Sequence, residues 1–404
     1  MDEISNSDEI NNLETKRPFQ IEGEAAKEME TKRPFQIEGE AAKEMETKRP
    51  FQIESEAAKE METKRPFQIE SKAETAYGGT KRPFQIESKA AKNIEMMRME
   101  IAKEFTGQGM LVRNALITLI AQGHLLVEGV PGLGKTLLVR CIAKAIGGSC
   151  ARVQFTPDLM PSDITGNIML EGQTLQFITK KGPVFNNIFI ADEINRAPAK
   201  TQAALFEAMQ EYQVSLDGLS HPLPRPFMVL ATENPFEHEG TYPLPDAQKD
   251  RFLLKVIADY PAFDEELAMV QRVVSKEGGG AELSVDMVRQ VMSLEEFYCL
   301  QKLSTQIMVA PPIIDYAVRL VSASRNNAAL QCGAGPRGSL ALIRAARALA
   351  LLEGRDFVIP DDIKSLAIPA LSHRLTLSAE SELEGLNADR IIEKIIAKTE
   401  APRT

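Results

Sequence analysis

An eight-residue segment, Gly129 to Thr136, constrains the fold of this chain more than any other part of the sequence. It reads Gly-Val-Pro-Gly-Leu-Gly-Lys-Thr and matches the pattern of a phosphate-binding loop, in which a glycine-rich turn ends in Gly-Lys-Ser/Thr. An apolar run, His124 to Glu128, precedes it, and a helix-forming stretch, Leu137 to Ile146, follows it. Because such a loop connects a strand to a helix, this context predicts an α/β domain with a nucleotide site.

Each part of this loop has an expected role that follows from the chemistry of phosphates. The glycines allow successive backbone N–H groups to turn toward the phosphates at a helix N-terminus, where the helix dipole also favours anions. We expect Lys135 to reach the β- and γ-phosphates of ATP and Thr136 to bind Mg²⁺ through its hydroxyl. The predicted nucleotide-binding residues are Gly129, Val130, Pro131, Gly132, Leu133, Gly134, Lys135 and Thr136.

Two further apolar runs end in residues that suit metal-dependent hydrolysis. The run from Ile188 to Ala191 leads into Asp192, the expected Mg²⁺ partner, and Glu193, the expected base that orients and polarises the attacking water. The run from Phe227 leads to Asn234, whose amide is expected to hold that water. An Asn before a proline is by itself typical of a turn, but its position after the acidic strand favours the catalytic interpretation.

Strand candidates alternate with helix candidates over residues 93–261, which predicts a parallel sheet covered by helices. After Pro261 the pattern is helical to the end, with a capping box at Ser293 to Glu296 and helix-starting prolines at Pro312 and Pro336. We therefore predict an α/β core over residues 93–261 and a smaller all-helical domain over residues 262–404. The strand candidates are His124–Glu128, Ala151–Phe155, Ile188–Ala191, Phe227–Ala231 and Leu253–Ile257.

The first 92 residues are tandem repeats. The string Thr-Lys-Arg-Pro-Phe-Gln-Ile-Glu occurs five times, and each unit offers little apolar surface among many charges. Such units cannot offset the entropy of ordering the chain, so we expect a flexible or transiently helical extension. The alternative is that the Arg-Pro-Phe-Gln-Ile strings are docking motifs that act through avidity. The repeated phenylalanines are Phe19, Phe35, Phe51, Phe67 and Phe84.

Composition excludes several classes of protein. The chain has 404 residues and a formal net charge of −10, which argues against general affinity for nucleic acid or for anionic lipids. The acidic N-terminus lacks the pattern of a signal peptide, and no apolar run approaches the roughly 20 residues that span a bilayer. The four cysteines and four histidines are scattered, without the close spacing of a zinc site. We expect a cytoplasmic protein without membrane insertion.

Three longer strings point to one family. They are Gln154 to Gly166, Ala191 to Pro198 and Glu239 to Pro245, and through them the chain strongly resembles the MoxR family of AAA+ ATPases over about residues 94–380. The resemblance implies a P-loop AAA+ core whose nucleotide lies between the core and a helical lid. It also implies a homo-oligomer, a hexamer in which the neighbouring subunit completes each site.

The resemblance gives two arginines a role. Arg251, in Asp-Arg-Phe, matches the family's arginine finger, which is supplied to the γ-phosphate of the adjacent subunit, and Arg337 matches the sensor arginine of the lid. Arg196 suits either a subunit interface or an ordinary ion pair. Relatives also carry two hairpins on the core, which match the segments Met169–Phe177 and Gln213–Leu219. The chain departs from the family pattern at Glu233, His238 and Gly335.

As an enzyme, the chain is expected to couple ATP hydrolysis to the remodelling or maturation of a protein client. Relatives often work with proteins that contain von Willebrand factor A domains, so the resemblance implies such a partner. The alternatives are a nucleic-acid motor, a metal-chelatase-like subunit for cofactor insertion, and a scaffold organised by the repeats. The acidic balance counts against the first, and the complete set of predicted site residues counts against the last.

Overall fold

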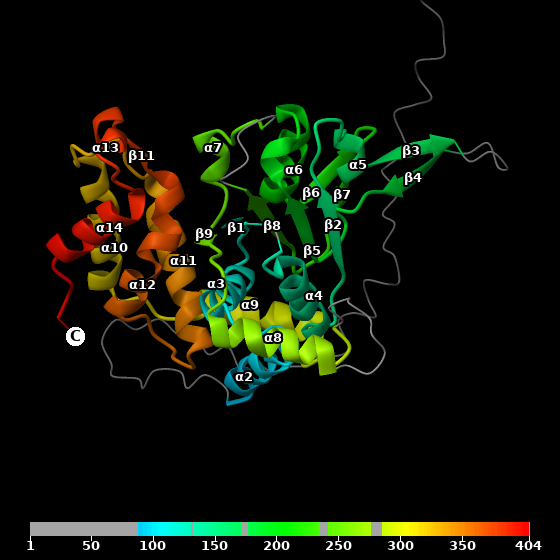
Figure 1. Ribbon diagram of the computed structural model, residues 1–404, viewed down its shortest axis with the longest axis horizontal. Coiled ribbons are helices and arrows are strands. Elements are labelled where there is room, and N and C mark those ends of the chain that lie inside the picture. The colour runs from blue at the N-terminus through cyan, green and yellow to red at the C-terminus, as the bar shows by residue number, and fades with distance from the viewer. Residues whose placement is uncertain (1–87, 131, 171–176, 235–240, 276–284, 404) are drawn as a thin grey trace, which may run out of the picture. The chain divides into compact units, whose positions relative to one another are not determined.

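The computed structural model describes residues 88–130, 132–170, 177–234, 241–275 and 285–403 (Figure 1). Most of the repeat region predicted over residues 1–92 lies outside these ranges. The same is true of Pro131 in the glycine-rich loop and of residues 235–240, which include His238. The structural description therefore covers the α/β region and the helices that follow it.

The described residues form a parallel sheet of five strands in the order β2-β5-β8-β1-β9. This order puts β5 and β8, the strands with polar ends, beside β1, the strand that leads into the glycine-rich loop. Because the strands are parallel, their carboxyl ends meet at one edge of the sheet. The predicted parallel α/β sheet is confirmed. Its strands are β1 (Leu125–Glu128), β2 (Cys150–Gln154), β5 (Ile188–Asp192), β8 (Met228–Glu233) and β9 (Leu254–Ile257).

Alternate residues of the central strands face two separate layers of helices. In β5, Ile188 and Ile190 belong to one apolar cluster, whereas Phe189 and Ala191 belong to the other, as the two-residue period of a strand requires. Both faces of the strand are therefore buried, which explains its unbroken apolar sequence. One cluster includes side chains of α2 (Ser88–Ala102), α3 (Gly109–Ile120), α4 (Lys135–Ala145) and α9 (Leu294–Gln306), and the other includes those of α6 (Ala199–Glu211).

The segment after the sheet forms the predicted helical lid. Its longest helix, α11, packs against α10 and α12, and it also contacts α3 of the α/β region and α9, which follows the sheet in the sequence and packs against its helices. A short antiparallel pair, β10 (Leu330–Cys332) and β11 (Thr376–Leu377), adds strands that the sequence pattern did not predict, because they are too short to show a period. The helices are α8 (Phe263–Ser275), α10 (Pro311–Arg325), α11 (Pro336–Leu352), α12 (Pro360–Leu371), α13 (Ala379–Leu383) and α14 (Ala388–Lys398).

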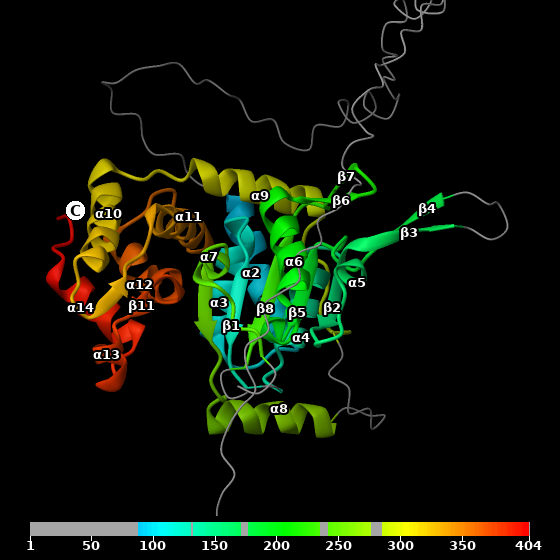
Figure 2. The same ribbon diagram turned by 90° about the horizontal axis from the view of Figure 1, so that it is seen from above.

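Two antiparallel hairpins accompany the sheet, as predicted. The strands β3 (Gly166–Leu170) and β4 (Phe177–Lys181) form the first, which extends away from the sheet in Figure 2. The strands β6 (Gln213–Leu216) and β7 (Leu219–Pro222) form the second. Within the described ranges, the structure contains no helix with the length and apolar content required to cross a membrane.

Candidate functional site

The glycine-rich loop joins β1 to the N-terminus of α4. Gly134 caps α4 in the left-handed region at φ +76°, a conformation that side chains with a Cβ rarely adopt. A Cβ on Gly129 would lie 2.5 Å from the carbonyl oxygen of Ala258, so the loop also needs a glycine where it passes β9. The backbone therefore bends at these glycines, and the loop leads directly into the first turn of α4, where anions bind favourably.

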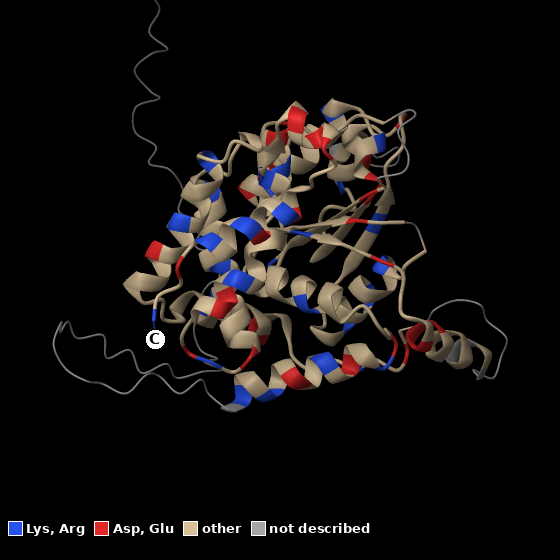
Figure 3. Ribbon diagram, turned by 60° about the vertical axis from the view of Figure 1, so that its left-hand side comes forward, with Lys and Arg blue, Asp and Glu red and all other residues tan. Residues whose placement is uncertain are grey.

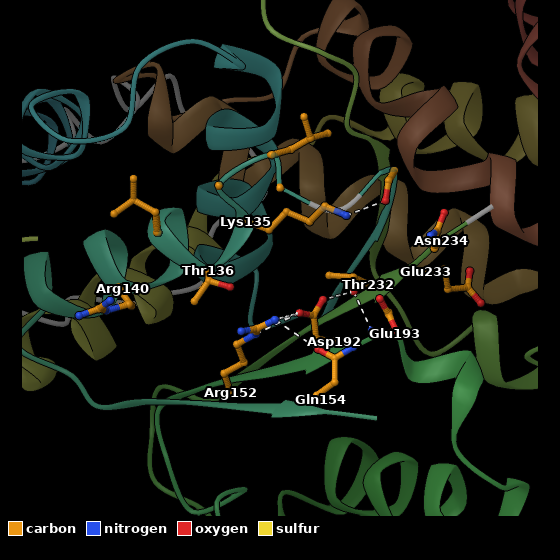
Figure 4. A pocket seen from close by; sticks show the side chains of 15 residues that line it. Lys135, Thr136, Arg140, Arg152, Gln154, Asp192, Glu193, Thr232, Glu233 and Asn234 are labelled. Atoms are coloured by element: carbon orange, nitrogen blue, oxygen red, sulfur yellow. Dashed lines mark hydrogen bonds and ion pairs between the residues drawn. The ribbon is translucent and has the colours of Figure 1, made fainter. Parts of the chain in front are cut away.

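Lys135 is the first residue of α4, and its side chain folds back across the loop. Its Nζ donates a hydrogen bond to the carbonyl oxygen of Gly129 at 2.8 Å (Figure 4). Burial lowers the pKa of Lys135, while the carboxylates of Asp192 and Glu193 act in the opposite direction. The ammonium group is thus held over the loop, on the side where the acidic end of β5 lies.

A cavity of about 490 Å³ opens beside this loop at the carboxyl edge of the sheet. It brings together residues from the loop, α4, β2 and the ends of β5 and β8, and Figure 4 shows several of their side chains converging. Cavities of this size suit a small molecule or cofactor. The lining residues are Gly129, Gly132, Leu133, Gly134, Lys135, Thr136, Leu137, Arg140, Arg152, Gln154, Asp192, Glu193, Thr232, Glu233 and Asn234.

Asp192 is the last residue of β5, and protein donors occupy both of its carboxylate oxygens. Oδ1 accepts a hydrogen bond from Thr232 Oγ1 at 2.5 Å. Oδ2 accepts from Arg152 Nε at 3.0 Å and also from Nη2 of the same guanidinium. The neighbouring strands β2 and β8 therefore fix the orientation of this carboxylate from two sides.

Glu193 follows directly and has left-handed backbone angles, with φ +54°. Its backbone N–H donates to Thr232 Oγ1 at 2.8 Å, and its Oε2 accepts from Arg196 Nη1 at 3.0 Å. The Thr232 hydroxyl thus links Asp192 to Glu193. A non-glycine residue in this backbone region is uncommon and is often found at functional sites, where the surroundings hold it in place.

The end of β8 contributes the other polar groups. Asn234 comes directly after the strand, is 9% exposed and lines the cavity, as the sequence predicted for a residue near Asp192. Glu233, one of the departures from the family pattern, also lines the cavity, and burial raises the pKa of its carboxyl. Gly335, another departure, is the N-cap of α11 and has no side chain to cap that helix.

The two predicted arginines lie elsewhere on the described chain. Arg251 follows the short helix α7 (Asp246–Lys249), and its Nη1 donates to the carbonyl oxygen of Phe206 at 2.9 Å. Arg337 lies in the first turn of α11, and its Nη1 is 3.5 Å from Asp250 Oδ2. Neither side chain is among the residues that line the cavity. The structure therefore brings together the loop, Asp192, Glu193 and Asn234, and leaves both arginines outside.

Sequence reasoning missed the residues that hold the acidic groups in place. Arg152 and Gln154 lie on β2, which pairs in parallel with β5 so that Gln154 is opposite Asp192. Thr232 lies on β8, on the other side of β5. The signal was present, since polar residues at the end of an apolar strand are notable, but their importance depends on knowing which strands are neighbours.

Comparison with known families agrees with this arrangement. A model described as the ATPase family associated with various cellular activities matches residues 124–254, which include four of the five strands of the sheet, the first residue of β9 and all residues that line the cavity. A second model, described as an AAA lid domain, matches residues 322–395. Together they cover most of the sheet and the helices from the end of α10 into α14.

Individual proteins match over most of the chain. Chaperone MoxR1 of Mycobacterium tuberculosis is 40% identical over 77% of this chain and 82% of its own length. Protein MoxR of Methylorubrum extorquens is 32% identical over 70% of this chain and 88% of its own. A crystal structure from Cytophaga hutchinsonii superposes with a TM-score of 0.72 at 38% identity, covering 78% of this chain and 96% of the other.

Proposed function

Because this chain belongs to the MoxR family of AAA+ ATPases, we propose that it hydrolyses ATP in this cavity and uses the energy to remodel or mature a protein client. One observation carries the proposal. The phosphate loop, the acidic end of β5 and the amide after β8 all line a single cavity at the carboxyl edge of the sheet. Catalysis of phosphoryl transfer depends mainly on positioning and on electrostatic stabilisation, and these groups are suited to both.

The donors in the cavity fit Mg²⁺. Mg²⁺ prefers oxygen ligands and is usually held by one or two protein groups together with phosphates and water. Thr136 and Asp192 are the residues proposed to hold it, and both line the cavity. The absence, among the described residues, of any group of three His, Cys, Asp or Glu side chains suited to a metal agrees with this mode. When bound, Mg²⁺ supplies positive charge that neutralises the phosphates.

Glu193 is the proposed base. Its carboxylate takes a proton from the water that attacks the γ-phosphate, and the side-chain amide of Asn234 holds the same water in line. The ion pair with Arg196 at Oε2 orients the carboxylate, and the Thr232 hydroxyl fixes the backbone beneath it. Lys135, now bonded to the loop carbonyl, exchanges that partner for phosphate oxygens when the nucleotide enters.

We further propose that the complete site forms between subunits of a hexamer. AAA+ proteins assemble into oligomers, and Arg251 lies outside the cavity of its own chain, as an arginine that serves a neighbour must. In this proposal Arg251 stabilises the charge that develops on the γ-phosphate in the adjacent subunit. Arg337 senses the nucleotide from the lid.

The proposed client is a protein. One relative is named a chaperone, and a protein with a von Willebrand factor A domain is the proposed partner class on the basis of the family resemblance. Lys and Arg are interspersed with Asp and Glu along the described ribbon (Figure 3). The formal net charge of −10 counts against the general affinity for phosphate backbones expected of a nucleic-acid motor, so we favour a protein client.

A pair of variants tests the proposed hydrolysis. Lys135→Ala removes the phosphate-binding ammonium and is expected to abolish ATP binding, measured by titration with a fluorescent ATP analogue. Glu193→Gln keeps the size and polarity of the side chain but removes the base. It is expected to bind ATP with unchanged affinity while phosphate release falls at least a hundredfold. Unchanged turnover in Glu193→Gln would sink the proposed mechanism.

A mixing experiment tests the shared site. Arg251→Ala subunits lack the finger, whereas Glu193→Gln subunits lack the base, so each oligomer alone is expected to be inactive. In mixed oligomers, an intact base from one variant meets an intact finger from the other, and part of the ATPase activity returns. If no mixing ratio restores activity although the subunits exchange, each site is built from one chain and the hexamer proposal fails.

A further inference from the structure

A buried arginine of the lid, Arg374, donates hydrogen bonds to the turn of residues 250–253, which contains Arg251. Arg374 lies at the end of the short 3₁₀ segment Ser372–Arg374, directly after α12. Its Nε donates to Asp250 Oδ1 at 2.7 Å. Its Nη2 donates to the carbonyl oxygens of Asp250 at 3.1 Å and Phe252 at 2.7 Å. The guanidinium therefore binds the backbone immediately before and immediately after Arg251.

Further contacts fix the guanidinium itself. Its Nη1 donates to the carbonyl oxygen of Leu253 at 3.3 Å and to that of Ala370 on α12. The side chain of Arg374 is only 4% exposed. Because an arginine presents its N–H groups in one rigid plane, a guanidinium held by so many acceptors leaves the bound backbone little freedom.

The turn is held from its other side by the core of the α/β region. Phe252 is fully buried, and its ring meets that of Phe206 edge to face at 5.9 Å between centroids. Arg251 lies over the same Phe206 ring at 5.8 Å and donates to the Phe206 carbonyl. The helix α7, which leads into this turn, lies between the sheet and the lid in both ribbon views (Figures 1 and 2).

The same turn also meets the proposed sensor of the lid. Asp250 accepts from Arg374 and lies 3.5 Å from Nη1 of Arg337, whose side chain is 61% exposed. The two arginines differ in their exposure to solvent. Arg374 is buried, whereas Arg337 is exposed, so solvent or a ligand can replace its contact with Asp250. The lid therefore contacts the residues on either side of Arg251 through two of its arginines.

We propose that Arg374 is a positioning residue for Arg251, through which the lid of one subunit sets the arginine finger offered to its neighbour. This inference rests on the proposed role of Arg251 in the adjacent site. Arg374 is not among the residues that line the cavity, and in this proposal its effect on hydrolysis is exerted through the backbone of residues 250–253.

The mixing experiment separates this role from a general role in lid folding. In the mixture of Glu193→Gln and Arg251→Ala subunits, called the parent mixture, the Glu193→Gln subunit supplies the finger and the Arg251→Ala subunit supplies the base. Arg374→Gln is then introduced into one of these two subunits at a time. On the finger-giving subunit we expect recovered phosphate release to fall at least tenfold. On the base-giving subunit, which has no finger to position, we expect recovery within about twofold of the parent mixture.

The outcomes distinguish the two proposals. Equal losses from both placements, or no loss from either, would overturn the positioning role while leaving the shared site intact. No recovery in the parent mixture itself would overturn the shared site and this inference together. Arg374→Lys serves as a milder second variant, because it keeps the positive charge beside Asp250 but loses the planar fork. It is expected to show the same asymmetry with a smaller loss.

A measurement on the full chain without nucleotide provides an independent readout. Arg374→Gln is expected to increase amide hydrogen exchange in a peptide covering residues 250–256 at least threefold more than in the α4 peptide, which reports the general loss of stability. Thr376→Val is the matched control. It removes another hydrogen bond between the lid and α7, from Thr376 Oγ1 to Asp246 Oδ2 at 3.1 Å, without touching residues 250–253. Unchanged exchange over residues 250–256 in Arg374→Gln would contradict the proposal.

Discussion

The cavity and the turn that carries Arg251 are both organised by an arginine–aspartate pair, but the two pairs lie in different surroundings. In the cavity, Arg152 is 50% exposed and pairs with Asp192. At the turn, Arg374 is 4% exposed and pairs with Asp250. The aspartates are similarly exposed, at 20% and 25%, so the difference lies in the arginines: water competes for the guanidinium of Arg152 and is largely excluded from that of Arg374.

This difference matches the roles proposed for the two regions. In the proposed mechanism, groups that line the cavity exchange partners when a nucleotide enters, so contacts open to solvent suit them. The proposed finger acts on a neighbouring subunit and needs its orientation in advance, which a buried network of hydrogen bonds provides.

The largest effect is expected at the turn, from Arg251→Ala. Loss of the proposed finger should lower ATP turnover by about 10³-fold, the lower end of the range for such fingers, while ATP affinity stays within about threefold. Phosphate release and nucleotide titration measure the two quantities. Arg319→Ala is the matched control, because Arg319 also lies over an aromatic ring, at 5.7 Å from Tyr316, and donates to a backbone carbonyl, that of Glu400. A loss below tenfold would contradict the proposed role.

The next largest effect is on stability, from Arg374→Gln. Removing one partner of a buried pair leaves Asp250 and several carbonyl groups without their donor, so the free energy of unfolding should fall by about 3 kcal/mol. Urea denaturation of the full chain, followed by circular dichroism, measures the change. A decrease below about 1 kcal/mol would show that solvent replaces Arg374 easily and that the turn is no more rigid than the cavity.

A pH effect tests another buried group, His124, which directly precedes β1. Its Nδ1 accepts from the backbone N–H of Val229, and its Nε2 is 3.0 Å from the Met209 carbonyl. Burial lowers the pKa of His124 to about 4 from 6.5. Between these values the unfolded chain binds the proton and the folded chain does not, so stability falls as pH is lowered from about 6.5 toward 4.

The free energy of unfolding is expected to fall by an amount on the order of 3 kcal/mol, because each unit of difference between the two pKa values corresponds to about 1.36 kcal/mol. Thermal denaturation over this pH range measures it. His124→Gln is the matched variant, because it keeps a polar group in the pocket but does not titrate, and it should show a flatter profile. Since burial also lowers the pKa of His373, some acid sensitivity is expected to remain. An identical profile in His124→Gln would exclude this residue as a source.

The smallest effect is expected in the cavity, from Arg152→Gln. This is the same substitution as at Arg374, applied to an exposed arginine. Because solvent already competes for the pair with Asp192, the free energy of unfolding should change by less than about 1 kcal/mol. The same urea denaturation measures it. A decrease as large as that of Arg374→Gln would remove the distinction between the two regions.

Much of the fold was predictable because its signals are local. The glycine-rich loop, the apolar strands and the capping box at Ser293 were each readable from neighbouring residues, and the structure confirms the sheet, the hairpins and that cap. The pair β10 and β11 was not predicted, because strands of two or three residues carry no detectable period.

The candidate site was predictable in part for the same reason. Asp192 and Asn234 each end or follow an apolar run, and Lys135 ends the loop that follows another, so the rule that parallel strands end at one edge was enough to group them. Arg152, Thr232 and Arg374 were not found. Their importance comes from partners that lie 40, 40 and 124 residues away in the sequence, which no local pattern records.

The sequence by itself determined the class of fold, the place of the phosphate loop and the identity of the acidic and amide groups around it. Each of these depends on the order of residue types along a short stretch of chain. Only the tertiary structure decided which charged groups pair with one another and how exposed each of them is to solvent. Those properties depend on the order of strands in the sheet and on the packing of the 3₁₀ segment Ser372–Arg374 against α7, and both are set by contacts between distant segments.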